Sequence, residues 1–283
     1  MNTIPIANTI ANVMAAAENN AKSQMREDDY TLDGIIHCGK CGRARQTWIE
    51  LLGRPMLVWC ICDCRVKELD EMERERTRNT IQSLKERGFH DRSLADNCFE
   101  RDENPDSMES TMCRNYVEHF DNFYERGKGL ILTGGVGTGK TFYASSIANA
   151  LMDKLHPVLV TSIGRMVREM ESDYGGRNDA IDGLNRYALV VFDDLGVERN
   201  TPYMNELLYS IIDSRIRSGK PMVITTNIPV SELKQPTNIE FARIYDRILS
   251  ACVPITFKGE NMRRRQLKET FADDLALLKG VSA

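Results

Sequence analysis

After residue 128, short apolar segments alternate with longer segments whose apolar residues recur at helical spacing. The apolar segments predict strands at Gly129–Thr133, Pro157–Thr161, Ala188–Phe192, Met222–Thr226 and Val253–Phe257. The helical segments are Lys140–Lys154, Ile163–Tyr174, Tyr203–Arg217 and Glu240–Leu249. Strands without polar alternation are buried on both faces, so we expect an α/β fold in which helices cover both faces of a parallel sheet.

The residues before that point follow a different pattern. Residues 34–65 hold five cysteines and two tryptophans and are too few to bury a core unaided. Val66–Arg87 is rich in Glu, Arg and Lys, which predicts an exposed helical spacer, and Met112–Tyr124 predicts an amphipathic helix. The weak apolar stripe in residues 1–33 fits either a docking helix or a disordered arm. We therefore expect an N-terminal arm and cysteine module at 1–65, a charged helical linker at 66–100 and the main domain at 101–283.

The composition narrows the class of protein. A chain of 283 residues with 42% hydrophobic and 28% charged residues suits a main domain with a smaller appendage. The net charge of −4 excludes a nucleic-acid polycation, so any DNA contact needs a local basic face or a ring of subunits. No apolar run is long enough to span a membrane, and Met1–Asn20 lacks a secretory signal, so we expect a cytoplasmic protein. In a reducing cytosol, its eight cysteines indicate metal ligation or burial rather than disulfides.

A glycine-rich run follows the first predicted strand of the main domain. Gly134, Gly135, Val136, Gly137, Thr138, Gly139, Lys140 and Thr141 fit the pattern G-x-x-x-x-G-K-[ST] between a strand and a helix. Glycines let main-chain N–H groups converge on phosphate oxygens, and the start of the helix adds a positive field. We expect Lys140 to reach the outer phosphates of ATP and the Thr141 hydroxyl to bind Mg²⁺.

Two carboxylates, Asp193 and Asp194, follow the predicted strand Ala188–Phe192. A buried strand excludes charge, so acids at its C-terminal tip indicate a compensating partner. In a doubly wound sheet this tip faces the same crevice as the phosphate loop. We expect Asp193 to hold Mg²⁺ through water and Asp194 to polarise the attacking water. The simpler alternative is two acids that open a surface turn.

The next predicted strand, Met222–Thr226, also ends in a polar run. A neutral amide at this tip can orient water near the γ-phosphate without adding charge. Asn227 is the candidate and Thr226 the fallback, although turns after strands favour Asn in any case.

Together, Gly134–Thr141, Val190–Gly196 and Ile224–Asn227 resemble the bacterial helicase-loader ATPases of the DnaC and DnaI type, AAA+ proteins that share their core with the IstB transposition ATPases. The resemblance covers about Phe99–Arg263, and Asn97–Asp102 resembles the Phe-containing stretch that precedes the loader core. It implies an AAA+ fold, ATP hydrolysis, an Mg²⁺/water site at the Asp-Asp run and a sensor 1 role for the Thr-Thr-Asn tip. Many AAA+ ATPases have Asp-Glu where this chain has Asp-Asp. The shorter second carboxylate predicts slow hydrolysis and a nucleotide switch.

The resemblance also implies two arginines at the nucleotide. Glu240–Ile248 resembles the helix that carries an arginine finger into the ATP of the neighbouring subunit, where Arg247 matches best and Arg243 is the rival. Gly259–Arg263 resembles the Gly-x-Ser-x-Arg of the family, with Asn261 in place of Ser. This makes Arg263 the candidate for the sensor 2 that acts in cis, with Arg264 and Arg265 as alternatives beside it. Without the resemblance, these are ordinary surface arginines.

The cysteines of the N-terminal module form two groups. The first is Cys38 and Cys41, and the second, about 20 residues later, is Cys60, Cys62 and Cys64. Two thiolate pairs at that spacing predict a Cys₄ site for Zn²⁺, which would contribute much of the folding free energy of so small a module. The second group would share one face of an extended strand, so spacing does not say which two of its cysteines bind. The resemblance to loaders favours Cys62 and Cys64, leaves Cys60 spare and makes His37 an outside candidate.

Three functions fit these features. The leading expectation is an ATP-switched loader that holds a hexameric replicative DNA helicase through the N-terminal module, self-associates through AAA+ interfaces and binds single-stranded DNA. Arg165, Arg168 and Arg177 are candidate DNA contacts, and the cysteine module could instead grip DNA or brace the N-terminal arm. The alternative is an IstB-like transposition helper with a transposase partner, which the cysteine-rich module argues against. The third is a nucleotide-dependent adaptor with negligible hydrolysis.

Overall fold

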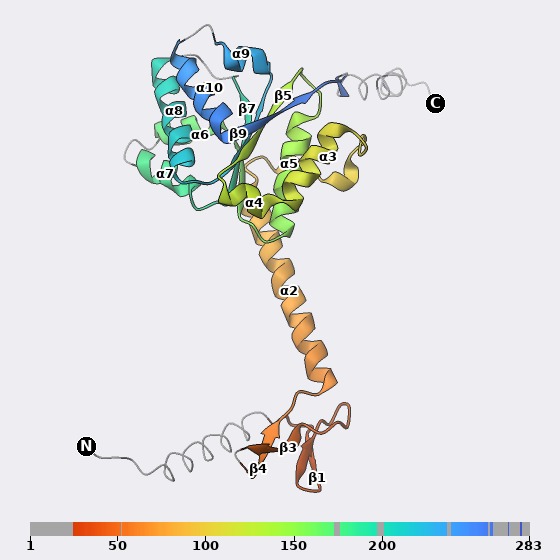
Figure 1. Ribbon diagram of the computed structural model, residues 1–283. Helices are drawn as coiled ribbons and strands as arrows, with labels where there is room; N and C mark the ends of the chain where they lie inside the picture. Colours follow the sequence, from red (N-terminus) through yellow and green to blue (C-terminus); the bar gives the residue numbers. More distant parts are fainter. Residues whose placement is uncertain are drawn as a thin grey trace, which may run out of the picture. The chain divides into compact units, whose positions relative to one another are not determined.

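The computed structural model describes residues 25–51, 53–172, 176–196, 201–236, 239–259, 261, 262, 271 and 278, apart from the side chains of residues 171, 172, 177, 239 and 240. The chain divides into two compact units, Met1–Arg78 and Asn79–Ala283 (Figure 1). The division falls inside the predicted charged linker. Within the described residues, no helix is both long and apolar enough to cross a membrane.

Two antiparallel hairpins precede the long helix of the first unit. Strand β1 (Tyr30–Leu32) pairs with β2 (Ile35–His37), and β3 (Gln46–Leu51) pairs with β4 (Arg54–Trp59). The turn between β1 and β2 is Asp33-Gly34, in which both residues have positive φ angles, 49° and 76°. This conformation is typical of the two-residue Asp-Gly hairpin turn, which fixes the register of the pair.

The second group of cysteines does not share an extended strand, so that expectation is wrong. β4 ends before Cys60, and the helix that follows begins ahead of Cys64, which places Cys62 in the connection between them. The Cys62 carbonyl accepts hydrogen bonds from the main-chain N–H groups of Arg65 (2.9 Å) and Val66 (3.1 Å). The chain therefore turns into a helix at Cys62 instead of continuing as a strand.

The predicted charged spacer is one continuous helix, α2 (Asp63–Gly88). Its last turn, which belongs to the second unit, ends in close contact with the main domain. A Cβ atom on Gly88 would lie 2.3 Å from Met152 Cε and 2.5 Å from the Val158 carbonyl oxygen. Just beyond the helix, Phe89 forms a parallel bridge with Val160. Glycine at position 88 thus permits an approach that any larger residue would prevent.

The second unit is built on one five-stranded sheet whose paired strands all run parallel. Its strands are β5 (Gly129–Gly134), β6 (Val158–Ser162), β7 (Leu189–Leu195), β8 (Met222–Thr226) and β9 (Cys252–Phe257), in the spatial order β6-β7-β8-β5-β9. All five predicted strands are confirmed. Because β8 lies between β7 and β5, the carboxyl ends of these three strands meet at one edge of the sheet, where ligands bind in such folds (Figure 1).

Helices cover both faces of this sheet, as the buried strands predict. The helices are α3 (Met108–Glu118), α4 (Phe120–Glu125), α5 (Lys140–Asp153), α6 (Ile163–Ser172), α7 (Arg177–Leu184), α8 (Pro202–Arg217), α9 (Val230–Lys234) and α10 (Ile239–Ala251). Side chains alternate along β5: Ile131 packs in the cluster formed with α6 to α10, whereas Leu130 and Leu132 pack with α3, α4 and α5. The expected α/β fold is confirmed.

Two features differ from the sequence prediction. The single amphipathic helix expected at Met112–Tyr124 is two helices, α3 and α4, which meet at His119. Helix α3 also begins earlier, because the Ser107 hydroxyl caps it by accepting the Ser110 N–H at 3.1 Å. The short helices α7 and α9, and 3₁₀ turns at Arg92–Leu94 and Phe99–Arg101, have too few residues to show a clear apolar period.

Candidate nucleotide site and cysteine cluster

The glycine-rich run forms a loop between β5 and α5 at the edge where the strand ends meet. Gly137 and Gly139 have φ angles of +79° and +93°, a left-handed conformation that costs little only for glycine. A Cβ atom on Gly137 would lie 2.1 Å from Asn261 Oδ1. Gly139 is the N-cap residue of α5, so the helix starts directly after the loop. The loop thus presents the start of a helix to a phosphate group.

Lys140, the first residue of α5, lies folded back over this loop. Lys140 is 5% exposed, and its Nζ donates hydrogen bonds to the carbonyl oxygens of Gly134 (3.0 Å) and Gly135 (2.7 Å). Its charge also acts on the nearby Asp193. The ammonium group thus lies at the loop, where the lysine of this pattern reaches phosphate oxygens.

Asp193 lies near the end of β7 and connects the loop to the neighbouring strand. Its Oδ1 accepts hydrogen bonds from the hydroxyls of Thr141 (2.9 Å) and Thr225 (2.7 Å). Burial raises the pKa of Asp193 and the charge of Asp194 raises it further, while the bond from Thr225 opposes both. A hydroxyl and a carboxylate in contact are oxygen ligands of the kind Mg²⁺ prefers, so this pair fits that ion.

Asp194 adopts the left-handed conformation, with a φ angle of +57°. Its main-chain N–H donates to the Thr225 hydroxyl at 2.9 Å, and the register between β7 and β8 shifts at this point. Of the non-glycine residues, Asp and Asn best tolerate this conformation. The irregularity turns two consecutive acids to different places: Asp193 bonds to Thr141, and Asp194 lines a cavity.

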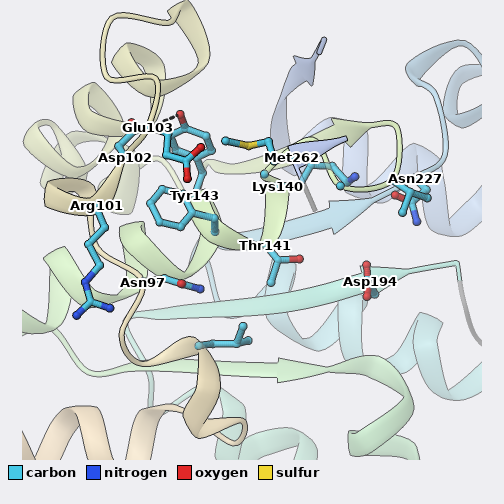
Figure 2. A pocket seen from close by; sticks show the side chains of 15 residues that line it. Asn97, Arg101, Asp102, Glu103, Lys140, Thr141, Tyr143, Asp194, Asn227 and Met262 are labelled. Atoms are coloured by element: carbon cyan, nitrogen blue, oxygen red, sulfur yellow. Dashed lines mark hydrogen bonds between the residues drawn. The ribbon is translucent and has the colours of Figure 1, made fainter. Parts of the chain in front are cut away.

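The cavity has a volume of about 430 Å³ and extends along the loop (Figure 2). Its described lining comes from residues 94–103, from the loop and α5, from the ends of β7 and β8 and from residue 262: Leu94, Asn97, Arg101, Asp102, Glu103, Val136, Gly137, Gly139, Lys140, Thr141, Phe142, Tyr143, Asp194, Asn227 and Met262. Thr141 lies between Asp194 on one side and Asn97 on the other (Figure 2). The predicted phosphate loop, water-polarising acid and amide therefore share one cavity.

Residues 94–103 form one wall of the cavity, and apart from the resemblance of Asn97–Asp102 to the loader family, the sequence did not predict this wall. Asp102, whose side chain is almost fully buried, accepts hydrogen bonds from the hydroxyls of Tyr143 (2.8 Å) and Ser110 (2.6 Å). Asn149 Nδ2 donates to the carbonyl oxygens of Ala95 (2.9 Å) and Asn97 (2.6 Å). Both Tyr143 and Asn149 lie on α5, so the helix that begins at the phosphate loop also holds the opposite wall.

Of the arginines predicted to contact the nucleotide, Arg247 and Arg243 lie within the described residues and Arg263 does not. Arg247, on α10, forms an ion pair with Asp213 and lies over the ring of Tyr209; the described lining of the cavity includes neither Arg247 nor its rival Arg243. Arg263 lies outside the described residues. The residue before it, Met262, donates its main-chain N–H to the Gly137 carbonyl at 2.9 Å.

The three arginines predicted to contact DNA differ in their partners and exposure. Arg165 donates to Glu169 Oε1 (2.8 Å) and to the His90 carbonyl (3.0 Å), so part of its charge is already compensated. Arg168 is exposed. The side chain of Arg177 lies outside the described structure.

In the first unit, four cysteines come together. The sulfur atoms of Cys38, Cys41, Cys62 and Cys64 all lie within 4.8 Å of one another. Four sulfurs bound tetrahedrally to Zn²⁺ would lie about 3.8 Å apart, given the usual Zn–S length, so the cluster fits that ion. The main-chain N–H of Cys41 lowers the pKa of the Cys38 thiol to about 7, whereas a hydrogen bond with the Cys41 side chain raises the pKa of Cys64 to about 11. The clustered thiols thus compete for negative charge, and a bound cation would relieve this competition.

The two other candidate ligands point to main-chain atoms. The thiol of Cys60 donates to the Ala44 carbonyl at 3.2 Å, and His37 Nδ1 lies 3.0 Å from the Gly42 carbonyl. Gly39 packs so closely on the chain that a Cβ atom there would lie 2.0 Å from the Asp28 carbonyl oxygen. Because Cys60 and His37 contact main-chain oxygens, the cluster consists of Cys38, Cys41, Cys62 and Cys64, which is the ligand set that the family resemblance favours.

Known proteins resemble a large part of this chain. Residues 73–270 match the family described as IstB-like ATP binding protein. The replicative helicase loader DnaI of Bacillus subtilis (strain 168) is 26% identical over 216 residues, which are 71% of this chain and 68% of that protein. The replicative helicase loader DnaC of Escherichia coli (strain K12) is 28% identical over 157 residues, which are 54% of this chain and 62% of that protein. The chain thus spans about two thirds of the length of these relatives.

Solved structures agree with the fold. The crystal structure of DnaI matches with a TM-score of 0.51 at 25% identity and covers 61% of this chain and 94% of that one. The crystal structure of the DnaC helicase loader matches with a TM-score of 0.52 at 21% identity and covers 59% of this chain and 100% of that one. The expected AAA+ fold is confirmed.

Proposed function

Because this chain belongs to the family of IstB-like ATP-binding proteins, we propose that it is an ATP-dependent loader that delivers a hexameric replicative helicase to single-stranded DNA in the cytoplasm. The contact of Asp193 with Thr141, beside the loop that Lys140 covers, is the observation that carries the nucleotide part of the proposal. The two helicase loaders among the matched relatives support the helicase part.

ATP would bind along the cavity with its phosphates at the loop of Gly134–Thr141. Lys140 would contact the outer phosphates, and Thr141 and Asp193 would hold Mg²⁺, which neutralises charge on the phosphates. Asp194 would polarise the attacking water, and Asn227 would orient it near the γ-phosphate from the end of β8. Since Asp194 is one methylene shorter than the usual Glu, we expect slow intrinsic hydrolysis, so that ATP acts as a switch.

Self-association would complete this site. In the proposed arrangement, Arg247 of one copy reaches the nucleotide of the next, and Arg263 contacts the nucleotide of its own chain. A finger supplied in trans contributes a factor of about 10³–10⁵ to the rate in other P-loop enzymes. Neighbouring AAA+ domains, at 101–283, would together bind single-stranded DNA, with Arg168 and Arg177 as candidate contacts.

The N-terminal module, at 1–65, would hold the helicase. Zn²⁺ bound by Cys38, Cys41, Cys62 and Cys64 would stabilise two small hairpins that have no sizeable core of their own. The helical linker, at 66–100, joins this module to the ATPase domain. If the N-terminal module binds the helicase and the ATPase domain binds ATP, helicase binding should depend on zinc and release of the helicase should depend on nucleotide.

A pull-down of the full chain against the replicative helicase of its native cell tests the proposal. We expect binding with ATP that a zinc chelator abolishes. Asp194→Asn should bind ATP and helicase but lose hydrolysis by about 10²-fold or more, because the amide cannot accept a proton. Asn keeps the left-handed conformation of this position, so the substitution is structurally mild. Full hydrolysis by Asp194→Asn would remove this residue from the mechanism.

A transposition helper is the second candidate, because the matched family is named for IstB-like proteins and one relative lies in an insertion sequence. That relative, an ATP-binding protein of Mycobacterium tuberculosis (strain ATCC 25618 / H37Rv), is 24% identical over 146 residues. The cysteine cluster favours the loader, since the helper's N-terminal region is not usually cysteine-rich. Failure to bind helicase with or without chelator, together with binding to a transposase, would establish the helper instead.

A further inference from the structure

Helices α8 and α10 lie side by side on one face of the sheet and share a cluster of charged residues (Figure 1). Asp213 on α8 forms an ion pair with Arg247 on α10. The guanidinium of Arg247 also lies 5.0 Å from the centre of the Tyr209 ring, one turn earlier on α8. Two contacts of different kinds therefore hold one arginine side chain.

Asp213 is the centre of this cluster. Its side chain is only 12% exposed; Oδ1 faces Arg247 and Oδ2 lies 2.8 Å from Arg217 Nε. The two arginines differ in exposure: the side chain of Arg217 is 76% exposed and that of Arg247 is 33% exposed. Arg217 is thus a solvated partner, whereas Arg247 is held against α8.

A held arginine can still contact a second anion. The guanidinium group carries five N–H donors, and the ion pair with Asp213 occupies only part of them. A free arginine loses considerable rotamer freedom when it docks, and a side chain that is already ordered loses less. A third of the Arg247 side-chain surface is exposed, so the side chain as a whole is not shielded from a neighbouring copy and its nucleotide.

We propose that Asp213 is a positioning residue for Arg247: the carboxylate and the Tyr209 ring orient the guanidinium before it meets the nucleotide of a neighbouring copy. This inference rests on the proposed role of Arg247 as a finger in trans. If the proposal holds, Asp213 affects the rate of ATP hydrolysis in the neighbouring copy. It does not affect the binding of ATP by its own chain.

A mixing experiment separates the finger from its positioning. A Lys140→Ala chain does not hold the phosphates but carries Arg247, and an Arg247→Ala chain holds ATP but lacks the finger. Each alone should hydrolyse ATP poorly, and their mixture should recover activity. If the mixture does not recover, Arg247 does not act in trans, and both the finger and the positioning role of Asp213 are overturned.

The second step adds Asp213→Asn to the Lys140→Ala chain. The chain that binds ATP is then the same in both mixtures, so the KM for ATP should stay constant while kcat falls by about 10- to 100-fold. Asp213→Glu, which keeps the charge, should recover part of the loss. Arg217→Gln in the same chain should have no effect, because it leaves the pair with Arg247 intact.

Thermal melting of each variant excludes unfolding as the cause of a loss. A kcat for the Asp213→Asn mixture equal to that of the parent mixture would overturn the positioning role while leaving the finger in place. A higher kcat would overturn it too and would mean that the ion pair restrains Arg247. A loss that Asp213→Glu does not relieve in a chain with normal melting would also count against the proposal, since the charge would then be irrelevant.

Discussion

Thr225 and Asp193 are joined across neighbouring strands by a hydrogen bond of 2.7 Å from the hydroxyl to Oδ1. The same hydroxyl accepts the main-chain N–H of Asp194 at 2.9 Å. One threonine on β8 therefore fixes both acids of β7, although the described lining of the cavity does not include it.

The first prediction concerns this threonine. Thr225→Val should lower the free energy of unfolding by about 1–3 kcal/mol, because it leaves the buried Asp193 carboxylate and the Asp194 N–H each without one partner. The rate of ATP hydrolysis should fall as well, since Asp193 then keeps only the hydrogen bond from Thr141. Denaturant unfolding and a steady-state ATPase assay measure the two effects. Thr225→Ser keeps the hydroxyl and should stay near the wild type in both; a Val variant as stable as Ser would contradict the prediction.

The second prediction compares two glycines of the phosphate loop. Gly137→Ala should weaken ATP binding, because an L-residue at a φ angle of +79° costs about 1–2 kcal/mol and its Cβ atom would meet the Asn261 side chain. Gly135→Ala is the matched control, since the nearest atom to its Cβ would be Thr138 Cγ2 at 3.7 Å, an ordinary contact. Titration with a fluorescent ATP analogue compares the affinities. Equal affinities would show that the loop adapts to a side chain at position 137.

The third prediction concerns the metal. The purified chain should contain a single zinc ion, and Cys62→Ser should lose it, because three thiolates and a hydroxyl bind Zn²⁺ far more weakly than four thiolates. Cys60→Ser is the control and should retain the zinc, since this thiol bonds to the Ala44 carbonyl instead. Elemental analysis gives the zinc content. Limited proteolysis should show that the chelator opens the first unit and leaves the second resistant; loss of zinc in Cys60→Ser would mean that the ligand set is different.

The fourth prediction concerns acid stability. His90 Nδ1 lies 3.1 Å from Thr161 Oγ1, and burial lowers the pKa of His90, with Glu169 opposing the change. A histidine whose folded pKa lies below the ordinary value of 6.5 takes up a proton more readily in the unfolded chain. The free energy of unfolding should therefore fall as the pH drops below 6.5 towards the folded pKa.

His90→Gln should make this pH dependence shallower, because glutamine does not titrate. His119→Gln, at an exposed histidine, is the control and should keep the slope of the wild type. Melting curves recorded between about pH 7.5 and about pH 5.5 measure the difference. A slope in His90→Gln as steep as that of the wild type would assign the acid sensitivity to other groups.

Local patterns predicted the elements that form the sheet and the loop. Apolar runs mark β5 to β8 because these strands are buried on both faces, and they mark the edge strand β9 although part of it is exposed. The pattern G-x-x-x-x-G-K-[ST] marks the loop because its two fixed glycines, Gly134 and Gly139, have positive φ angles. The same holds for the pair Asp193 and Asp194, which stand out as charges at the end of a buried strand. These features depend on neighbours in the sequence, which is why they are visible without a structure.

The partners of the site residues depend on distant contacts, and the sequence did not predict them. Tyr143 and Asp102 are 41 positions apart, and Thr225 and Asp193 are 32 apart, so packing of whole elements decides both hydrogen bonds. The ion pair of Arg247 with Asp213 likewise requires that α8 and α10 be adjacent. The start of helix α2 at Asp63 was missed because three cysteines at alternate positions have the period of a strand.

Gly88 allows the last turn of α2 to pack directly against helix α5. Helix α5 begins at Lys140 beside the phosphates, and its Met152, near the far end, lies where a Cβ on Gly88 would collide. One helix, α5, therefore carries both the first residue after the phosphate loop and a side chain packed against the last turn of α2. If nucleotide binding shifts α5, we expect the shift to reach the end of α2 through this contact.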